Sequence, residues 1–196
     1  MQLNDNYLIT KSFNMKRILG LALVAVIQGC ANQSVTTETL VEESCIGTTA
    51  ISSELSDKLK SIQDSSLLAQ TLGEPLQGKL CQGAVYQNTQ DVTLYRAWNS
   101  TNPNSQFGEW WAFELPSGKT ADYRKNYEIC YQWSPLDKLS KCTLKAGTKV
   151  VVGNGQSAQC SEYLTYPVSE VQQIFIADSV NSVADCQVYD SVISWE

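Results

Sequence analysis

Six of the seven cysteines lie between residues 45 and 186, and they constrain the fold of this chain more than any other feature. An even number of cysteines in an exported chain is typical of a disulfide framework, and six cysteines allow fifteen pairings. Zinc binding is the alternative, but the sequence has no histidine and no Cys-x-x-Cys pair. We therefore predict three disulfides, without indicating which cysteines pair: Cys45, Cys81, Cys130, Cys142, Cys160 and Cys186.

The N-terminus predicts export. Met15-Lys16-Arg17 precede an apolar run over residues 18–27, which suits the hydrophobic region of a signal peptide and is too short to span a bilayer. The run ends in Ile27-Gln28-Gly29-Cys30, which resembles a bacterial lipobox. We expect residues 1–29 to be a signal peptide, with Met15 as an alternative start. A buried N-terminal helix is the structural alternative.

The lipobox resemblance implies that Cys30 carries a lipid and that the membrane is a partner of this chain. Residues 30–48 are rich in Thr, Ser and Glu and are expected to be the lipidated cysteine and a tether. Residues 49–196 are expected to form a single globular domain. Ala31, which follows the cysteine, favours the outer membrane of a bacterial envelope, with secretion as the alternative.

The composition excludes several kinds of active site. Because the chain has no histidine, it cannot hold a Ser-His-Asp or Cys-His triad or a histidine general base, and we expect no metal. The net charge of −6 gives no sign of a large nucleic-acid surface. Any chemistry must come from Arg, Asp, Glu, Gln, Ser, Tyr, Trp or Cys side chains.

The hydrophobic pattern changes near residue 80. Before it, apolar residues at helical spacing predict a helix over 51–72, or two helices divided at Asp64. After it, segments rich in β-branched and aromatic residues predict strands at 83–87, 92–98, 109–115, 127–131, 149–152, 172–177 and 186–194. The expected fold class is α+β, with short N-terminal helices followed by a mostly antiparallel β domain.

Arg96 is the first candidate site residue. On the predicted strand 92–98 it shares its face with Val92, Leu94 and Trp98, and a guanidinium on an apolar face needs an anion or carbonyl groups. The functional interpretation is a diphosphate or carboxylate of a ligand. The structural alternative is an internal ion pair.

Two further segments contribute candidates. Trp110 and Trp111 are adjacent and would point to opposite faces of a strand, one into the core and one into a cleft where it could stack on a flat ring. Glu170, Gln172 and Gln173 lead into an apolar strand, where they would face the mouth of a cleft. For both segments, ordinary packing is the alternative. The Gly153-Asn154-Gly155 segment could cradle a phosphate, but a strand followed by an Asn-Gly turn is the favoured interpretation.

The order of these segments resembles the ADP-ribosyltransferase fold. The stretch Val92-Thr-Leu-Tyr-Arg96-Ala is similar to the first conserved strand of its cholera- and pertussis-toxin-like, Arg-led branch. Glu170-Val171-Gln172-Gln173 resembles the segment that carries the last catalytic motif, and the resemblance spans residues 84–177. It implies a two-sheet β domain, here stapled by disulfides.

The resemblance also implies a function, the cleavage of NAD as a substrate. Arg96 would hold the phosphates or ribose of NAD, and Trp110 or Trp111 would stack near the nicotinamide. The bond between nicotinamide and ribose would break through an oxocarbenium-like state, with Glu170, Gln172 or Gln173 binding the ribose.

The sequence departs from the family pattern at two positions. Gln172 stands where the (Gln/Glu)-x-Glu motif ends in Glu, and Ala112 stands where Ser or Thr is expected. An amide binds a hydroxyl group but brings no negative charge, which favours NAD hydrolysis, a base-modifying activity or an inactive descendant over protein ADP-ribosylation. The main alternative is a non-catalytic envelope lipoprotein that acts as a binding module. A carboxylate pair among Glu109, Glu114, Glu128 and Glu170 is a third interpretation.

Overall fold

The computed structural model describes residues 44–190, which belong to one compact unit. The predicted signal peptide, Cys30 and most of the predicted tether lie outside these residues. Five antiparallel strands form the larger sheet, in the order β1 (Leu59–Ser61), β2 (Leu80–Asn88), β6 (Lys149–Gly155), β9 (Gln172–Phe175) and β4 (Trp110–Trp111). A three-stranded sheet has the order β10 (Val183–Asp190), β5 (Lys138–Leu144) and β3 (Val92–Trp98).

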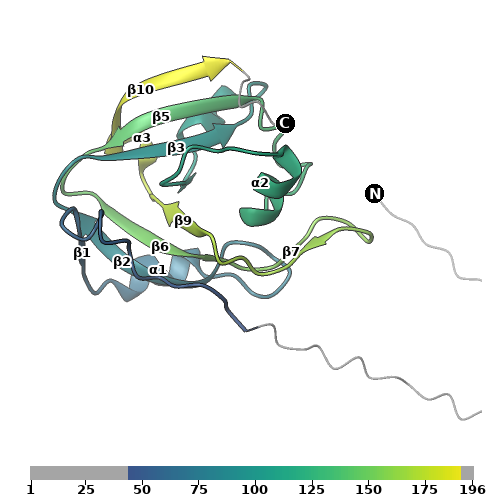
Figure 1. Cartoon of the computed structure of the whole chain (residues 1–196), viewed down its shortest axis with the longest axis horizontal. Coiled ribbons are helices and arrows are strands. Elements are labelled where there is room, and N and C mark those ends of the chain that lie inside the picture. Colours follow the sequence, from purple (N-terminus) through teal and green to yellow (C-terminus); the bar gives the residue numbers. More distant parts are fainter. Residues whose placement is uncertain (1–43, 191–196) are drawn as a thin grey trace, which may run out of the picture. The chain divides into compact units, whose positions relative to one another are not determined.

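The remaining elements are short. β7 (Ala158–Gln159) and β8 (Thr165–Tyr166) form a two-stranded hairpin that projects from the larger sheet in Figure 1. The helices are α1 (Ser65–Thr71), α2 (Thr120–Asn126), α3 (Ser179–Ser182) and the 3₁₀ helix η1 (Pro103–Phe107). The expectation of a mostly antiparallel β domain with few helices is thus confirmed.

The main hydrophobic core lies between the two larger sheets (Figure 1). Each sheet sends alternate side chains into it, as a pleated strand requires. The larger sheet supplies Leu59, Tyr86, Trp111, Val150, Val152 and Ile174, and the smaller sheet supplies Val92, Leu94, Cys142, Leu144 and Val183. Val151 and Phe175 point the other way, into a second cluster that is covered by α1.

Most strand predictions are confirmed, one is wrong, and four strands were not predicted: β1, β5, β7 and β8. The strand at 92–98 has the predicted bounds, and the predicted strand at 109–115 shortens to β4. The strand predicted at 127–131 is wrong, because α2 ends at Asn126 and the chain then turns through Glu128 with a φ of 47°. The sequence pattern did not indicate β5, whose segment carries two lysines.

The single long helix predicted over 51–72 is also wrong. Leu59 begins an edge strand that pairs with β2, and only Ser65–Thr71 is helical. Asp64 caps this helix by accepting a hydrogen bond from the Leu67 amide at 3.0 Å, so the helix begins directly after Asp64, but the described residues before Asp64 form a turn and a strand and not a second helix. The helical spacing reflected burial, because the apolar residues do pack inward, but they do so from a turn, a strand and a helix.

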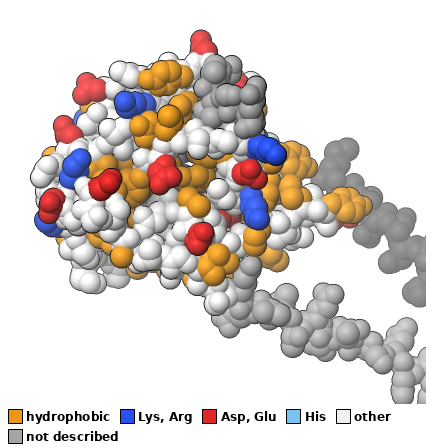
Figure 2. Space-filling view, in the orientation of Figure 1, with side chains coloured by type: hydrophobic (Ala, Val, Ile, Leu, Met, Phe, Trp, Pro, Cys, Tyr) orange, Lys and Arg blue, Asp and Glu red, His pale blue; other side chains and the backbone are white. Residues whose placement is uncertain are grey.

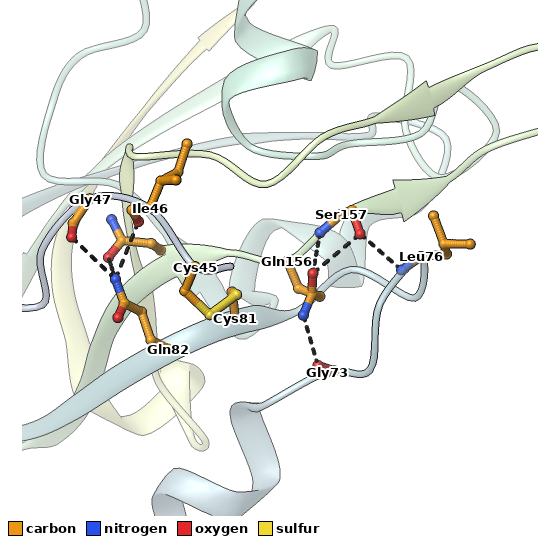
Figure 3. Close-up of a disulfide and its surroundings, with 10 residues drawn as sticks. Cys45, Ile46, Gly47, Gly73, Leu76, Cys81, Gln82, Gln156 and Ser157 are labelled. Carbon is orange, nitrogen blue, oxygen red and sulfur yellow. Dashed lines mark hydrogen bonds between the residues drawn. A yellow bond between two sulfur atoms is a disulfide. The ribbon is translucent and has the colours of Figure 1, made fainter. Parts of the chain in front are cut away.

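The prediction of three disulfides is confirmed. They join Cys45 to Cys81, Cys130 to Cys160 and Cys142 to Cys186. The first bond attaches residues 44–50 to β2, where Gln82 Nε2 donates to the carbonyl groups of Ile46 and Gly47 (Figure 3). This N-terminal segment is therefore fixed to the larger sheet.

Figure 2 shows the charges on one face of the molecule. On the face drawn in Figure 2, Lys and Arg side chains stand among Asp, Glu and uncharged groups and form no continuous basic patch. Among residues 44–190, the helices are too short to cross a membrane.

Candidate functional site

A pocket with a volume of about 310 Å³ lies beside β3, between β4, β9 and the loop that follows α2. This volume is at the lower end of the range typical of small-molecule sites. Aromatic side chains form much of the wall, and a cation, a carboxyl group and an amide stand among them. The lining includes Tyr95, Arg96, Trp98, Trp110, Trp111, Tyr123, Tyr127, Glu128, Trp133 and Gln173.

Four of the six site residues that the sequence suggested line this pocket. Arg96, Trp110, Trp111 and Gln173 come from three strands that are far apart in the sequence. Glu170 and Gln172 do not line it. Gln172 Nε2 donates to the carbonyl groups of Thr48 and Ala50, both at 2.8 Å, and thereby holds the N-terminal segment.

Glu170 is exposed and lies just before β9. Its backbone carbonyl accepts a hydrogen bond from Asn154 Nδ2 at 2.7 Å, and Asn154 Oδ1 accepts one from Gln82 Nε2 at 3.0 Å. These amide contacts link β2, β6 and the segment before β9. Together with Gln172 they form a structural network beside the disulfide of Figure 3.

Arg96 is held by backbone carbonyl groups. Its Nε donates to the Ser105 carbonyl at 2.7 Å, and its Nη1 donates to the Trp110 carbonyl. Among residues 44–190, no carboxylate lies within ion-pair distance of this guanidinium. Burial lowers the pKa of Arg96 to about 10, an effect that Tyr123 and Glu109 oppose, so the side chain is a cation at neutral pH.

The two tryptophans of β4 divide as the strand geometry requires. Trp111 is buried in the core between the sheets and donates from its indole Nε1 to the Gly108 carbonyl at 2.8 Å. Trp110 is half-buried and packs on the opposite cluster, edge-on against Phe175 with ring centroids 5.1 Å apart. Both contribute to the pocket wall.

Glu128 and Gln173 form a buried pair at the pocket. Gln173 Nε2 donates to Glu128 Oε2 at 2.6 Å, and the two side chains are 6 % and 2 % exposed. Glu128 Oε1 is buried and accepts no hydrogen bond from the described residues. Burial raises the pKa of Glu128 to about 9, while interactions with Gln173 and Ser169 lower it in part. Glu128 is therefore an uncharged carboxylic acid at neutral pH.

Gly155 makes room for this acid. A Cβ atom at residue 155 would lie 1.8 Å from Glu128 Oε2, so the carboxyl group would have to leave its position. Gly153 allows a similar close approach, to the Gln82 carbonyl of β2. The predicted Asn-Gly turn is wrong, because β6 continues through Gly155 and pairs with both β2 and β9.

Sequence reasoning named Glu128 only as one of four acids with nothing to distinguish it. The sequence feature that points to Glu128 lies in another segment, the Gly153-Asn154-Gly155 stretch of β6. A strand that contains Gly-Asn-Gly is unusual, because glycine weakens a strand unless another group approaches closely. The approaching group itself could not be read from the sequence.

Burial also affects the tyrosines of the pocket. It raises the pKa of Tyr123, which packs against Tyr127 with ring centroids 4.5 Å apart. Burial likewise raises the pKa of Tyr127, and the nearby carboxyl groups of Glu114 and Glu128 add to this. Both phenols are therefore neutral, and they act as aromatic surface and hydrogen-bonding groups.

The pocket thus combines a buried cation, Arg96, an exposed one, Lys79, one neutral acid, the buried amide of Gln173 and several aromatic planes. Such a set suits a ligand with a flat ring, hydroxyl groups and an anionic group. Within the described part of the chain, no group of three or more Cys, Asp or Glu side chains is arranged to hold a metal ion. Comparisons with protein-family models, with curated proteins and with solved structures give no match for this chain.

Proposed function

We propose that this chain is an NAD-consuming enzyme of ADP-ribosyltransferase type that cleaves the bond between nicotinamide and ribose and transfers the ADP-ribose to water. One observation carries the proposal: Arg96, the Trp110-Trp111 pair and Gln173 line one pocket. The resemblance of the sequence implies that these three segments share one cleft.

The charges of the pocket support the proposal. Arg96 is a cation without a carboxylate partner among residues 44–190, and Glu128 is neutral. An anionic group of a ligand would therefore meet a net positive wall, as the diphosphate of NAD requires. The volume of about 310 Å³ suits the nicotinamide–ribose end of NAD and leaves the adenosine end outside.

Two buried polar atoms give further support. Trp98 Nε1 and Glu128 Oε1 make no hydrogen bond with the described residues, and both side chains line the pocket. Buried polar groups normally have partners. A ligand that carries hydroxyl and carboxamide groups would supply them.

The reaction then needs little from the protein beyond binding and orientation. The ribose–nicotinamide bond breaks, its electron pair goes to the ring nitrogen of nicotinamide, and an oxocarbenium-like ribose forms. A water oxygen bonds to the same carbon, and one proton passes to solvent. Gln173 binds a ribose hydroxyl, and Trp110 or Trp111 packs against the nicotinamide. Gln173 brings an amide where the family motif supplies a carboxylate, so no negative charge at this position stabilises the positive charge that develops on the ribose. As argued from the sequence, this favours water as the acceptor of the ADP-ribose.

A second candidate is a non-catalytic binding module. The contacts of Arg96 favour it, since two of its N–H groups donate to backbone carbonyls and so have a structural role. On this alternative the pocket binds a small ligand without changing it.

We also propose that the protein is exported and lipid-anchored in the bacterial envelope through Cys30. The three disulfides support an oxidising compartment. Incorporation of a radiolabelled fatty acid by the whole chain, and its loss in Cys30→Ser, tests the anchor. Labelling that persists in Cys30→Ser would refute it.

The proposed activity is tested by incubating the oxidised protein with NAD and separating the products. The expected result is equal amounts of nicotinamide and ADP-ribose from the wild type, and at least about 100-fold less from Gln173→Ala. Gln172→Ala is the matched control, because it removes the neighbouring amide, which does not line the pocket. NAD that binds and stays intact would favour the binding module.

A further inference from the structure

The amide of Gln173 has two ends, and one of them is already engaged. Its Nε2 donates to Glu128 Oε2 at 2.6 Å, while its Oε1 accepts no hydrogen bond from the described residues. Gln173 is on β9 and lines the pocket, so this oxygen is its remaining polar group for a ligand. The contact with Glu128 therefore determines that the amide oxygen, and not the nitrogen, is available to a ligand.

Three features of the fold hold the Glu128 carboxyl group in the position where it accepts the hydrogen bond from Gln173. The chain passes through it with a φ of 47°, in the left-handed region that costs energy for a residue other than glycine. Two residues later, Cys130 is bonded to Cys160, which anchors the loop to the β7–β8 hairpin. Gly155 on β6 leaves the space that the carboxyl group fills. Three separate features thus converge on one side-chain position.

We propose that Glu128 is a positioning residue for Gln173: its buried carboxyl group takes the amide nitrogen and so leaves the amide oxygen as the acceptor for a ligand hydroxyl. The inference rests on the proposed function only for the identity of that hydroxyl, a ribose hydroxyl of NAD. The position of the acid itself rests on the contacts above. The raised pKa of Glu128 agrees with this role, because a neutral acid can remain buried without a cation.

Among the described residues that line the pocket, Glu128 is the only carboxylic acid, and Glu114 acts on the neighbouring Tyr127 from outside the lining. The other titratable side chains that line the pocket are Lys79, Tyr95, Arg96, Tyr123 and Tyr127. Tyr127 directly precedes Glu128 in the chain, and the Ser169 hydroxyl interacts with the acid from the segment before β9. A titration observed at Gln173 near pH 9 can therefore be assigned to Glu128 by substitution.

The first test does not depend on NAD. In the ¹⁵N-labelled protein, one Nε2 proton of Gln173 should exchange slowly with solvent, and its signal should shift with a midpoint near pH 9. In Glu128→Gln the slow exchange should persist, because a carbonyl oxygen still accepts the bond, and the titration should vanish. In Glu128→Leu the protection should be lost. A Gln173 amide that exchanges freely in the wild type, or a titration that survives in Glu128→Gln, would overturn the proposal.

The second test is a double-mutant cycle on NAD cleavage. Glu128→Leu should lower kcat about 10- to 100-fold with a smaller change in KM, and Glu128→Gln should stay within a few-fold of the wild type. In the Gln173→Ala background, Glu128→Leu should cost little more. Glu162→Leu, a change of an exposed acid on the β7–β8 hairpin, is the control. Additive losses would overturn the positioning role.

The two tests separate the two proposals. A wild type that does not cleave NAD refutes the proposed function, and the amide exchange then still decides the role of Glu128. A wild type that cleaves NAD while the amide exchange is the same in Glu128→Leu refutes the positioning role alone.

Discussion

Gly108 packs directly against the guanidinium group of Arg96. A Cβ atom at residue 108 would lie 2.1 Å from Arg96 Nη2 and 2.6 Å from its Cζ. The φ of Gly108 is −65°, which any residue adopts, so the need for glycine here is steric. The absence of one side chain thus leaves the space in which the pocket cation lies.

This contact predicts that Gly108→Ala displaces Arg96 and lowers NAD cleavage at least about 10-fold, as expected when a positioned cation moves by about 1 Å. Steady-state kinetics measures the effect. Gly118→Ala is the control, because Gly118 has a φ of +79° and does not line the pocket. It should lower stability by about 1 kcal/mol and leave cleavage unchanged. Equal activity in both variants would contradict the role given to Arg96.

Arg96→Lys tests the same cation through its chemistry. Lysine keeps the charge but cannot make two bonds in the fixed geometry of a guanidinium, so we expect NAD binding to weaken and stability to fall by about 2 kcal/mol. Calorimetric titration and urea unfolding measure the two effects. Arg124→Lys is the matched control, because Arg124 also donates to two carbonyl groups, those of Ile129 and Ser134, without lining the pocket. Loss of binding in both variants, or in neither, would count against the site.

Two disulfides should differ in their effect on function. Removing the Cys130–Cys160 bond frees the loop that carries Glu128 and Trp133, so Cys130→Ala/Cys160→Ala should lose both stability and NAD cleavage. Removing Cys45–Cys81 should cost a similar stability, about 3–4 kcal/mol for loops of this size, with little effect on cleavage. Thermal unfolding and kinetics of the two double variants check this. Equal losses of activity would show that the loop is not positioned by its disulfide.

The buried acid predicts how stability depends on pH. The pKa of Glu128 is about 9 in the folded chain and about 4.5 when exposed, so the folded state binds more protons between these values. The contribution of Glu128 is complete below pH 4.5 and is lost as pH rises toward 9. Urea unfolding should therefore show falling stability across this interval in the wild type and a flatter profile in Glu128→Gln. Identical profiles would contradict a neutral buried acid.

Secondary structure could be predicted from the sequence where the alternation of neighbouring side chains determines it. The strand at 92–98 follows from the alternation of its side chains and is present with the predicted bounds. The long helix over 51–72 failed because Leu59 gains more from pairing with β2 than from continuing a helix. β5 was not indicated because its two lysines obscure the alternation, although its partners lie on both sides.

The site was predictable only in part, for a related reason. Arg96, Trp110, Trp111 and Gln173 were indicated because short motifs mark them. Glu128 was not, because its distinction lies in being buried against Gly155 and Gln173, which are distant in the sequence. Glu170 and Gln172 lie beside Gln173 in the motif, yet they face the N-terminal segment or solvent, a division that only the register of β9 determines.

The most direct test of the site is the spectrum of the tryptophan side chains in ¹⁵N-labelled Gln173→Ala, titrated with NAD. This variant is expected to leave NAD uncleaved during the titration. A backbone spectrum like that of the wild type verifies that the variant is folded. The indole signals of Trp98, Trp110 and Trp111 should shift together and saturate, because all three side chains line one pocket. Indole signals that do not move at millimolar NAD, in the variant and in the wild type alike, would contradict the assignment of this pocket to NAD.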